Sequence, residues 1–305
     1  EGELTNQVVF EETDDQVFVT VQTANLRREP STDAEILATA PMSRLFVRTG
    51  VSAEWSRIKE GGKTYYVSNE VISTERPEAA GDGTLVPETE GTAASSAGKT
   101  VIIDPGHQGS GDSTQEPIGP GASSTKARVT SGTSGCVSGL DEYQLNLTVS
   151  LKLRDELVNR VYTVYMTRET HDVNISNKER AEFATEHGGD ILVRIHANGS
   201  ENSSVSGALT MAPSEGNSFL SPDLISKSQQ LSQNIIDAYT ASTGFASQGV
   251  YITDEMSGIN WSTMPVTIVE MGYMSNPSDD AAMADPAMQA KMVSGIADGI
   301  GKYFG

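Results

Sequence analysis

The feature that most constrains the fold of this chain is an apolar stretch that stops abruptly at a histidine. Val101–Ile103 predict a short buried strand, which Pro105 and Gly106 end, so that His107 stands at the strand's exit. Two later stretches share this pattern of an apolar run that delivers a polar side chain: Ile191–Ile195 followed by His196, and Val266–Val269 followed by Glu270. Ligands of α/β domains bind outside the carboxyl ends of the strands. The pattern therefore predicts a site that contains two histidines and a carboxylate.

From Lys99 to Gly305, apolar strands alternate with helical patterns, which is typical of an α/β domain. The clearest helix runs from Asp141 to Arg160, where apolar side chains recur every four residues. Glu142 opens this helix and points along its apolar stripe. A carboxylate there needs a partner, because burying it alone costs free energy. A metal ion is one such partner, and the positive end of the helix dipole is the alternative.

The chain before Lys99 has a different pattern. Residues 1–15 are acidic and aperiodic, which predicts a flexible N-terminus. Residues 16–74 contain short alternating runs separated by turn residues, and these predict a small all-β barrel. Residues 75–98 are rich in Gly, Thr, Pro, Glu, Ala and Ser, which predicts a linker. We therefore expect two domains, the second covering residues 99–305.

Charge argues against nucleic acid as a partner, and hydropathy argues against a membrane span in this chain. The chain carries 21 basic and 41 acidic side chains, a net charge of −20, whereas proteins that bind nucleic acid neutralise phosphates with Lys and Arg. No run approaches the ~18 apolar residues that a membrane span needs. The first residues lack the basic and apolar pattern of a signal peptide, so we expect any signal or anchor segment to lie outside this numbering.

The side chains of His107, Glu142 and His196 offer the donor set that catalytic zinc favours, which is three protein ligands and an open fourth position. Zinc polarises a carbonyl group and lowers the pKa of water toward 7. Glu270 is then placed to take a proton from water and pass it to a leaving amine. The spacing alone is not diagnostic, since the chain has no His-Glu-x-x-His motif, and ordinary polar roles for these residues remain open.

The remaining histidines and the single cysteine fit structural roles better than catalytic ones. His171 lies in a polar turn, and His187 ends a helix, where a cationic side chain suits the negative pole. Cys136 has no histidine near it in the sequence, so a nucleophilic thiol is disfavoured. It belongs to residues 108–139, a long loop rich in Gly, Ser, Thr and Pro that is either functional or conceals an element.

Residues 99–305 resemble the zinc-dependent N-acetylmuramoyl-L-alanine amidases of the Amidase_3 type. The motifs that carry the resemblance occur in order along the domain: Ile103–His107, Glu142 with Asn146, Thr167–Arg168, Asn177 with Arg180, Ile195–Asn198 and Val269–Asn276. The resemblance implies one zinc ion held by His107, Glu142 and His196, with Glu270 as the catalytic acid and base. It also implies a mixed, largely parallel sheet flanked by helices.

The same resemblance implies a substrate and a place of action. The substrate is peptidoglycan, including both glycan strand and stem peptide, cut at the amide that joins the muramic acid lactyl group to L-alanine. The location is the cell wall or the outside of a bacterium. Two alternatives stay open: a wall-binding scaffold without hydrolytic activity, and a zinc hydrolase of another amide. The scaffold is disfavoured because no ligand or base is missing.

Residues 16–74 resemble bacterial SH3-like (SH3b) domains. The matching pieces are Ala24–Ser31, Trp55–Ile58 and Tyr65–Ser68. This resemblance implies a small SH3-like barrel that targets the wall or acts as a spacer. The alternative is that Trp55, Tyr65 and Tyr66 only form the core and rim of the barrel.

The chain also departs from the amidase pattern, and these departures suggest further roles. Arg194 stands where the family often has serine, and alternation along the strand places it on the face of His196. Together with Arg168 and Asn198, it is our candidate for binding the substrate, because arginine pairs well with a carboxylate. For Arg180 an ion pair within the protein is the better expectation. The loop 108–139 either blocks the site, which then needs an activator protein, or lines the substrate groove.

Overall fold

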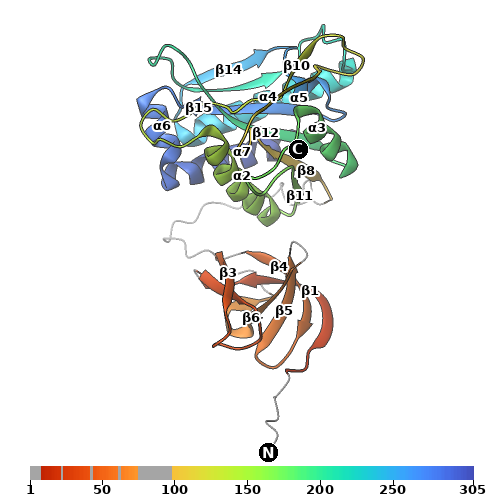
Figure 1. Ribbon diagram of the computed structural model, residues 1–305, viewed down its shortest axis with the longest axis vertical. Helices are drawn as coiled ribbons and strands as arrows, with labels where there is room; N and C mark the ends of the chain where they lie inside the picture. The colour runs from red at the N-terminus through yellow and green to blue at the C-terminus, as the bar shows by residue number, and fades with distance from the viewer. Residues whose placement is uncertain (1–7, 22, 42–43, 61–62, 75–97) are drawn as a thin grey trace, which may run out of the picture. The chain divides into compact units, whose positions relative to one another are not determined.

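The structure is a computed structural model that describes residues 8–21, 23–41, 44–60, 63–74 and 98–305 (Figure 1). These residues form two compact units, one on each side of the segment 75–97. The expected linker therefore lies outside the described residues except for Gly98, and so do residues 1–7 of the expected flexible N-terminus. No helix in the described part of the chain is both long and apolar enough to cross a bilayer.

The N-terminal unit is a seven-stranded antiparallel sheet in the order β3-β2-β6-β5-β4-β1-β7. Its elements are β1 (Glu11–Val19), β2 (Thr23–Arg27), β3 (Ile36–Pro41), β4 (Leu45–Val51), β5 (Trp55–Glu60), β6 (Lys63–Ser68), the 3-10 turn η1 (Asn69–Val71) and β7 (Ile72–Ser73). Alternate side chains such as Val17, Leu26, Phe46 and Ile58 form its core. The prediction of an all-β unit is confirmed.

Two details of this unit differ from the prediction. The strand β3 at one edge does not pair with β7 at the other among the described residues, so the predicted closed barrel is not shown. Alternation indicates which face of a strand is buried, but it does not encode which edges meet. The strand β1 begins at Glu11, within the segment that we expected to be flexible.

This acidic segment is ordered because β1 pairs with β4, and ion pairs with β4 and β5 add to that pairing. Glu12 accepts hydrogen bonds from Arg57 of β5, at 2.6 and 2.7 Å. Asp15 accepts from Arg48 of β4, in which Nε donates to Oδ1 at 2.9 Å and the second contact joins Nη2 and Oδ2. Composition alone could not predict these partners, because both arginines lie more than thirty residues further along the chain.

The C-terminal unit contains a six-stranded sheet in the order β11-β8-β12-β15-β13-β14. Its strands are β8 (Thr100–Pro105), β11 (Thr163–Met166), β12 (Ile191–Asn198), β13 (Ala208–Ala212), β14 (Ser247–Ile252) and β15 (Val266–Tyr273). Only β13 and β15 pair in an antiparallel manner, while the other four neighbouring pairs are parallel. The predicted mixed, largely parallel sheet is confirmed.

Helices cover both faces of this sheet. They are α2 (Glu142–Asn159), α3 (Asn177–Glu186), α4 (Pro222–Thr243), α5 (Ser257–Asn260), α6 (Pro277–Ala284) and α7 (Pro286–Phe304). Val101 and Ile103 of β8 pack in one apolar cluster with α2, α4 and α7. Ile102, between them, packs in a second cluster with residues of α3 and α5. Side chains of one strand thus alternate between two buried faces, which explains the continuous apolar runs of the sequence.

The long loop 108–139 contains an element that the sequence did not reveal. Strands β9 (Asp112–Pro117) and β10 (Thr125–Val129) form an antiparallel hairpin. Most of its residues are polar and exposed, so they lack the apolar alternation by which a half-buried strand is recognised. The hairpin is held to the domain at Trp261, whose Nε1 donates to the carbonyl oxygen of Pro117 at 2.8 Å.

Candidate metal centre

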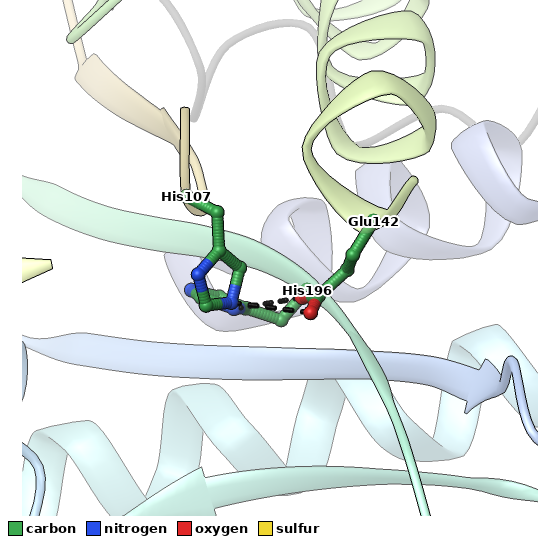
Figure 2. Close-up of side chains that lie close together, drawn as sticks. All are labelled: His107, Glu142 and His196. Atoms are coloured by element: carbon green, nitrogen blue, oxygen red, sulfur yellow. Dashed lines mark hydrogen bonds and ion pairs between the residues drawn. The ribbon is translucent and has the colours of Figure 1, made fainter. Parts of the chain in front are cut away.

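Three elements bring His107, Glu142 and His196 together (Figure 2). His107 follows β8, Glu142 is the first residue of α2, and His196 lies within β12. One ligand atom from each side chain lies within 4.8 Å of the others. In the part of the chain that the structure describes, no other group of three His, Cys, Asp or Glu side chains is close enough to share an ion. The proximity predicted from the sequence is therefore found.

The position and protonation of His107 are set by its neighbours. Its backbone has a φ of 59°, the left-handed region, directly after the strand ends. Its Nδ1 lies 2.8 Å from the carbonyl oxygen of Thr130, which can only accept, so the ring proton is on Nδ1. The lone pair of Nε2 is therefore directed to the site, where it lies 3.2 Å from Oε2 of Glu142. A carbonyl oxygen that accepts from the outer ring nitrogen is typical of histidines that bind metals.

Glu142 is buried and is held by several donors. Its Oε2 accepts from the backbone N–H of Thr133 at 3.0 Å, and its Oε1 accepts from the N–H of Ala197 and from Nδ2 of Asn146, both at 3.1 Å. Burial alone would raise the pKa of this carboxyl, but its contacts with the imidazole rings of His107 and His196 hold its pKa below the ordinary value. The carboxylate is thus ionised and fixed in direction.

His196 is kept neutral by its surroundings. Burial is the main cause that lowers its pKa to about 4, although the hydrogen bond to Glu142 opposes the shift. Its Nε2 is buried and has no hydrogen-bond partner among the described residues. Gly106 makes room for the ring, because a Cβ at that position would lie 2.2 Å from its Cε1. A buried, neutral imidazole with an unpartnered nitrogen, beside a second imidazole and a carboxylate, fits the requirements of a zinc ligand set.

Glu270 of β15 stands next to this cluster. It is paired with His196 in the parallel register of β12 and β15, and both line the same pocket. Burial first, and then the negative charge of Glu142, raise the pKa of Glu270 to about 8. Its Oε2 is buried without a hydrogen-bond partner in the described chain. A carboxyl group that titrates near neutral pH is suited to accept and return a proton.

The pocket around these residues has a volume of about 540 Å³. Apart from the four residues above, it is lined by the following: Thr130, Gly132, Thr133, Ala197, Asn198, Gly199, Ser200, Glu201 and Ser275. Volume does not by itself identify the site, since a pocket of 570 Å³ lies at the opposite, amino ends of the strands, near Lys99, Asp190 and Pro265. The convergence of donors distinguishes the first pocket from the second.

A buried ionic network lies beneath the ligands. Asp104, at the end of β8, is fully buried and accepts from Arg180 at 2.7 Å and from Arg194 at 2.6 Å. Burial opposes its ionisation, but the two guanidinium groups hold the pKa of Asp104 far below its usual range. Arg180 also donates to the carbonyl oxygens of Pro105 and His107, at 2.8 and 2.9 Å. The expectation of an internal ion pair for Arg180 is confirmed.

Two of the predicted substrate-binding residues are turned away from the pocket. Arg168 is buried, and it donates to the carbonyl oxygens of Pro105, Gly106 and Tyr143. Arg194 is buried between Asp104 and the side chain of Asn177. In this structure neither guanidinium group lines the pocket, and both are engaged by the protein itself. The alternation of side chains along a strand predicts the face on which each one lies. It does not predict whether a side chain reaches the pocket, because helices cover both faces of this sheet.

The other candidates from the sequence are placed as follows. Asn198 lines the pocket, with its Oδ1 accepting from the N–H of Gly199 at 2.8 Å. His187 stacks on Phe183, and His171 packs edge-on against Tyr143, so neither belongs to the ligand group. Cys136 is exposed.

The supporting contacts of several residues were not predicted. Asn146 lies one helical turn after Glu142, so the i, i+4 rule could have indicated its contact. Thr130 and Thr133, by contrast, follow the hairpin, and no local sequence signal places them beside the ligands.

Comparisons with known proteins agree with this geometry. Residues 101–302 match the family model Amidase_3, described as N-acetylmuramoyl-L-alanine amidase. The chain is 27% identical over 282 residues to the putative N-acetylmuramoyl-L-alanine amidase YrvJ of Bacillus subtilis, covering 92% of this chain and 48% of YrvJ. It is 26% identical over 224 residues to the N-acetylmuramoyl-L-alanine amidase Rv3717 of Mycobacterium tuberculosis, covering 72% of this chain and 92% of Rv3717.

Solved structures give the same result. The crystal structure of the N-acetylmuramyl-L-alanine amidase Ami1 from Mycobacterium smegmatis superposes with a TM-score of 0.62 at 28% identity, covering 68% of this chain and 98% of Ami1. The family match covers about two thirds of the chain and includes His107, Glu142, His196 and Glu270. The chain therefore belongs to the Amidase_3 family of N-acetylmuramoyl-L-alanine amidases.

Proposed function

We propose that this chain is a zinc-dependent peptidoglycan hydrolase that cleaves the amide between the lactyl group of N-acetylmuramic acid and L-alanine of the stem peptide. The observation that carries the proposal is the set of His107, Glu142 and His196, with ligand atoms within 4.8 Å of one another and beside a buried Glu270. A scaffold without hydrolytic activity would not need to keep a buried carboxyl group next to three such donors.

The zinc ion would be held by His107, Glu142 and His196, and it would act as a Lewis acid that polarises the substrate carbonyl and acidifies water. Neighbouring groups of the protein keep these three side chains ready to bind the ion. Thr130 keeps the ring proton of His107 on Nδ1, and burial keeps His196 neutral, so both imidazoles offer lone pairs. The N–H groups of Thr133 and Ala197 keep Glu142 in one orientation.

Glu270 is the proton carrier in this proposal. As a carboxylate it takes a proton from the water that attacks the carbonyl carbon. As the carboxylic acid it then returns that proton to the nitrogen of L-alanine when the C–N bond breaks, leaving a lactyl carboxylate and a free amine. The raised pKa of about 8 keeps both proton transfers accessible near neutral pH.

The segments outside the site also have roles in the proposal. Residues 16–74 serve as an SH3-like module for wall binding or spacing, and residues 75–98 as a linker, so that the enzyme acts in the cell wall outside the cell. The match to YrvJ supports shared architecture, because 92% coverage must extend well into the N-terminal unit. The chain spans about half the length of YrvJ, so this relative contains further residues.

The loop 108–139 builds the site in this proposal and does not block it. Thr130, Gly132 and Thr133 line the pocket, and two of them contact His107 and Glu142. If a residue of this loop inhibited the enzyme by binding the metal, a His, Cys, Asp or Glu side chain of the loop would lie among the candidate ligands. In the described residues, the group of candidate ligands contains no side chain from residues 108–139. The three candidate ligands thus line the pocket together with residues of this loop.

Digestion of purified peptidoglycan tests the function directly. The products are identified by mass spectrometry before metal removal, after treatment with a chelator, and after zinc is added back. We expect stem peptides with a free L-alanine amine, lost on chelation and restored by zinc. Binding to the wall without release would favour the scaffold, and cleavage restricted to other amides would favour a different zinc hydrolase. Repeating the digest with residues 108–139 shortened tests the role of the loop.

A further inference from the structure

The wall of the pocket is unusual in its charge. Beyond the ligands and Glu270, the only charged side chain among its described lining residues is Glu201, and none of these lining residues is Lys or Arg. The rest of the wall is neutral, with hydroxyl and amide groups from residues such as Thr133, Asn198 and Ser275. A substrate carboxylate in this groove would therefore meet no ion-pair partner in its wall.

The cations nearest in the fold do not supply one. Arg168 and Arg194 are buried, with their guanidinium groups engaged by the protein itself. Arg128 of the hairpin bridges Asp112 at 3.0 Å and Glu179 at 2.8 Å. The positive charge of a bound divalent ion would be offset in part by Glu142. Away from the ion, the lining of the pocket therefore offers a substrate carboxylate no positive charge.

The loop that carries Glu201 is held beside the pocket by hydrogen bonds on either side of this residue. The N–H of the preceding residue, Ser200, donates to Oγ of Ser275 at 2.9 Å. Two residues further on, the carbonyl oxygen of Ser203 accepts from Nδ2 of Asn276, also at 2.9 Å. The side chain of Glu201 is exposed and forms no ion pair with any residue that the structure describes. It is thus a negative charge in the lining of the pocket that no ion pair among the described residues offsets.

We infer that the groove selects stem peptides in which the residue after L-alanine carries a neutral amide in place of a carboxylate, and that Glu201 sets this preference. The inference rests on the proposed function. That residue of the stem is a D-glutamyl unit, whose α-carboxyl group is either free or amidated as D-isoglutamine. The free form brings a negative charge toward Glu201. The amidated form brings two N–H donors to a wall rich in hydroxyl and carbonyl acceptors.

The expected size of the effect follows from the exposure of Glu201. Interactions between exposed charges change equilibria by about two- to fivefold and weaken as salt rises. We therefore expect the amidated substrate to have a kcat/KM about two- to fivefold higher at low salt. Glu201→Gln removes one repulsion and should bring the ratio close to one. Glu201→Lys replaces it by an attraction and should make the free carboxylate the better substrate.

The test uses the zinc-loaded full chain and two synthetic substrates whose γ-carboxyl group is blocked as a methylamide, just as the next residue blocks it in the stem. They are the γ-methylamides of N-acetylmuramoyl-L-alanyl-D-isoglutamine and N-acetylmuramoyl-L-alanyl-D-glutamate. The ratio of their kcat/KM values is measured for the wild type, Glu201→Gln, Glu201→Lys and the control Glu186→Gln. Glu186 is an exposed acid at the far end of α3 and does not line the pocket, so its substitution should leave the ratio unchanged.

Each outcome has a distinct meaning. A wild-type ratio near one, or a ratio that Glu201→Gln and Glu201→Lys leave unaltered, would overturn the inference while the proposed function stands. Glu186→Gln shifting the ratio as much as Glu201→Gln would assign the preference to net charge and also overturn it. If neither short substrate nor purified peptidoglycan is cleaved, the proposed function fails, and the inference loses its basis.

Discussion

Replacing Glu270 by glutamine should stabilise the metal-free protein. The same replacement should abolish the activity of the zinc-loaded protein. The carboxyl group is buried, its Oε2 has no hydrogen-bond partner in the described chain, and its pKa is raised from an ordinary 4.5 to about 8. Glutamine has nearly the same shape and no charge. It therefore removes the cost of a buried carboxylate without creating a cavity.

The magnitude and its sign follow from linkage between ionisation and folding. Because the pKa is raised in the folded state, the stability from protonated Glu270 is fully present below pH 4.5 and is lost as the pH rises to about 8. The loss is ~1.4 kcal/mol for each pH unit in that window, or several kcal/mol in total. A typical domain has only about 5–15 kcal/mol of stability, so the effect is measurable.

Hydrogen exchange followed by mass spectrometry provides the assay, since it reports on the C-terminal unit by itself. Exchange of peptides from β15 is measured in chelator at pH 5 and pH 8, after correction for the intrinsic pH dependence of exchange. The free energy of opening should be similar for wild type and Glu270→Gln at pH 5, and higher for the variant at pH 8. Glu186→Gln serves as control. A difference between Glu270→Gln and wild type that is the same at both pH values would refute the reasoning.

Three further predictions concern the ligands and their support. His196→Ala should lose both zinc binding and activity, whereas Glu270→Ala should bind zinc but lose turnover. Zinc binding is measured as the rise in Tm when zinc is added, which the wild type and Glu270→Ala should show and His196→Ala should not. Gly106→Ala should weaken zinc affinity by about 10–100-fold in a chelator competition, because the new Cβ would lie 2.2 Å from the His196 ring; unchanged affinity would contradict the close approach. Asp104→Asn should destabilise the folded protein by about 3–5 kcal/mol in urea unfolding, because it leaves Arg180 and Arg194 buried without a counter-charge; a change below ~1 kcal/mol would show that the network is dispensable.

The three candidate ligands could be located from the sequence because each has a local signal. Pro105 and Gly106 mark the end of β8 and so the place of His107. Asp141 and Gln144 form the capping box that starts α2, which makes Glu142 its first residue. Parallel strands bring their carboxyl ends to one edge, so signals far apart in the chain point to one site.

The features that could not be predicted depend on tertiary partners. The burial of Arg194 depends on the helices that cover the sheet, and that of Arg168 on the carbonyl groups of Pro105, Gly106 and Tyr143 that accept from it. The order of the acidic segment before Val17 depends on Arg48 and Arg57. The hairpin in residues 108–139 is built from polar residues that gain their partners only in the folded domain.

The hydrogen bonds around Asp104 also bear on how the site responds to changes in metal supply. Arg180 and Arg168 donate hydrogen bonds to the carbonyl oxygens of Pro105, Gly106 and His107. These bonds fix the backbone that carries His107, the first candidate ligand in the chain. A binding site whose scaffold is already in place undergoes little reorganisation when the ion arrives or leaves. Loading and depletion should then be reversible steps of a folded enzyme, with exchange set by the donor atoms and not by refolding of the domain. Activity would in that case follow the local concentration of zinc over repeated cycles.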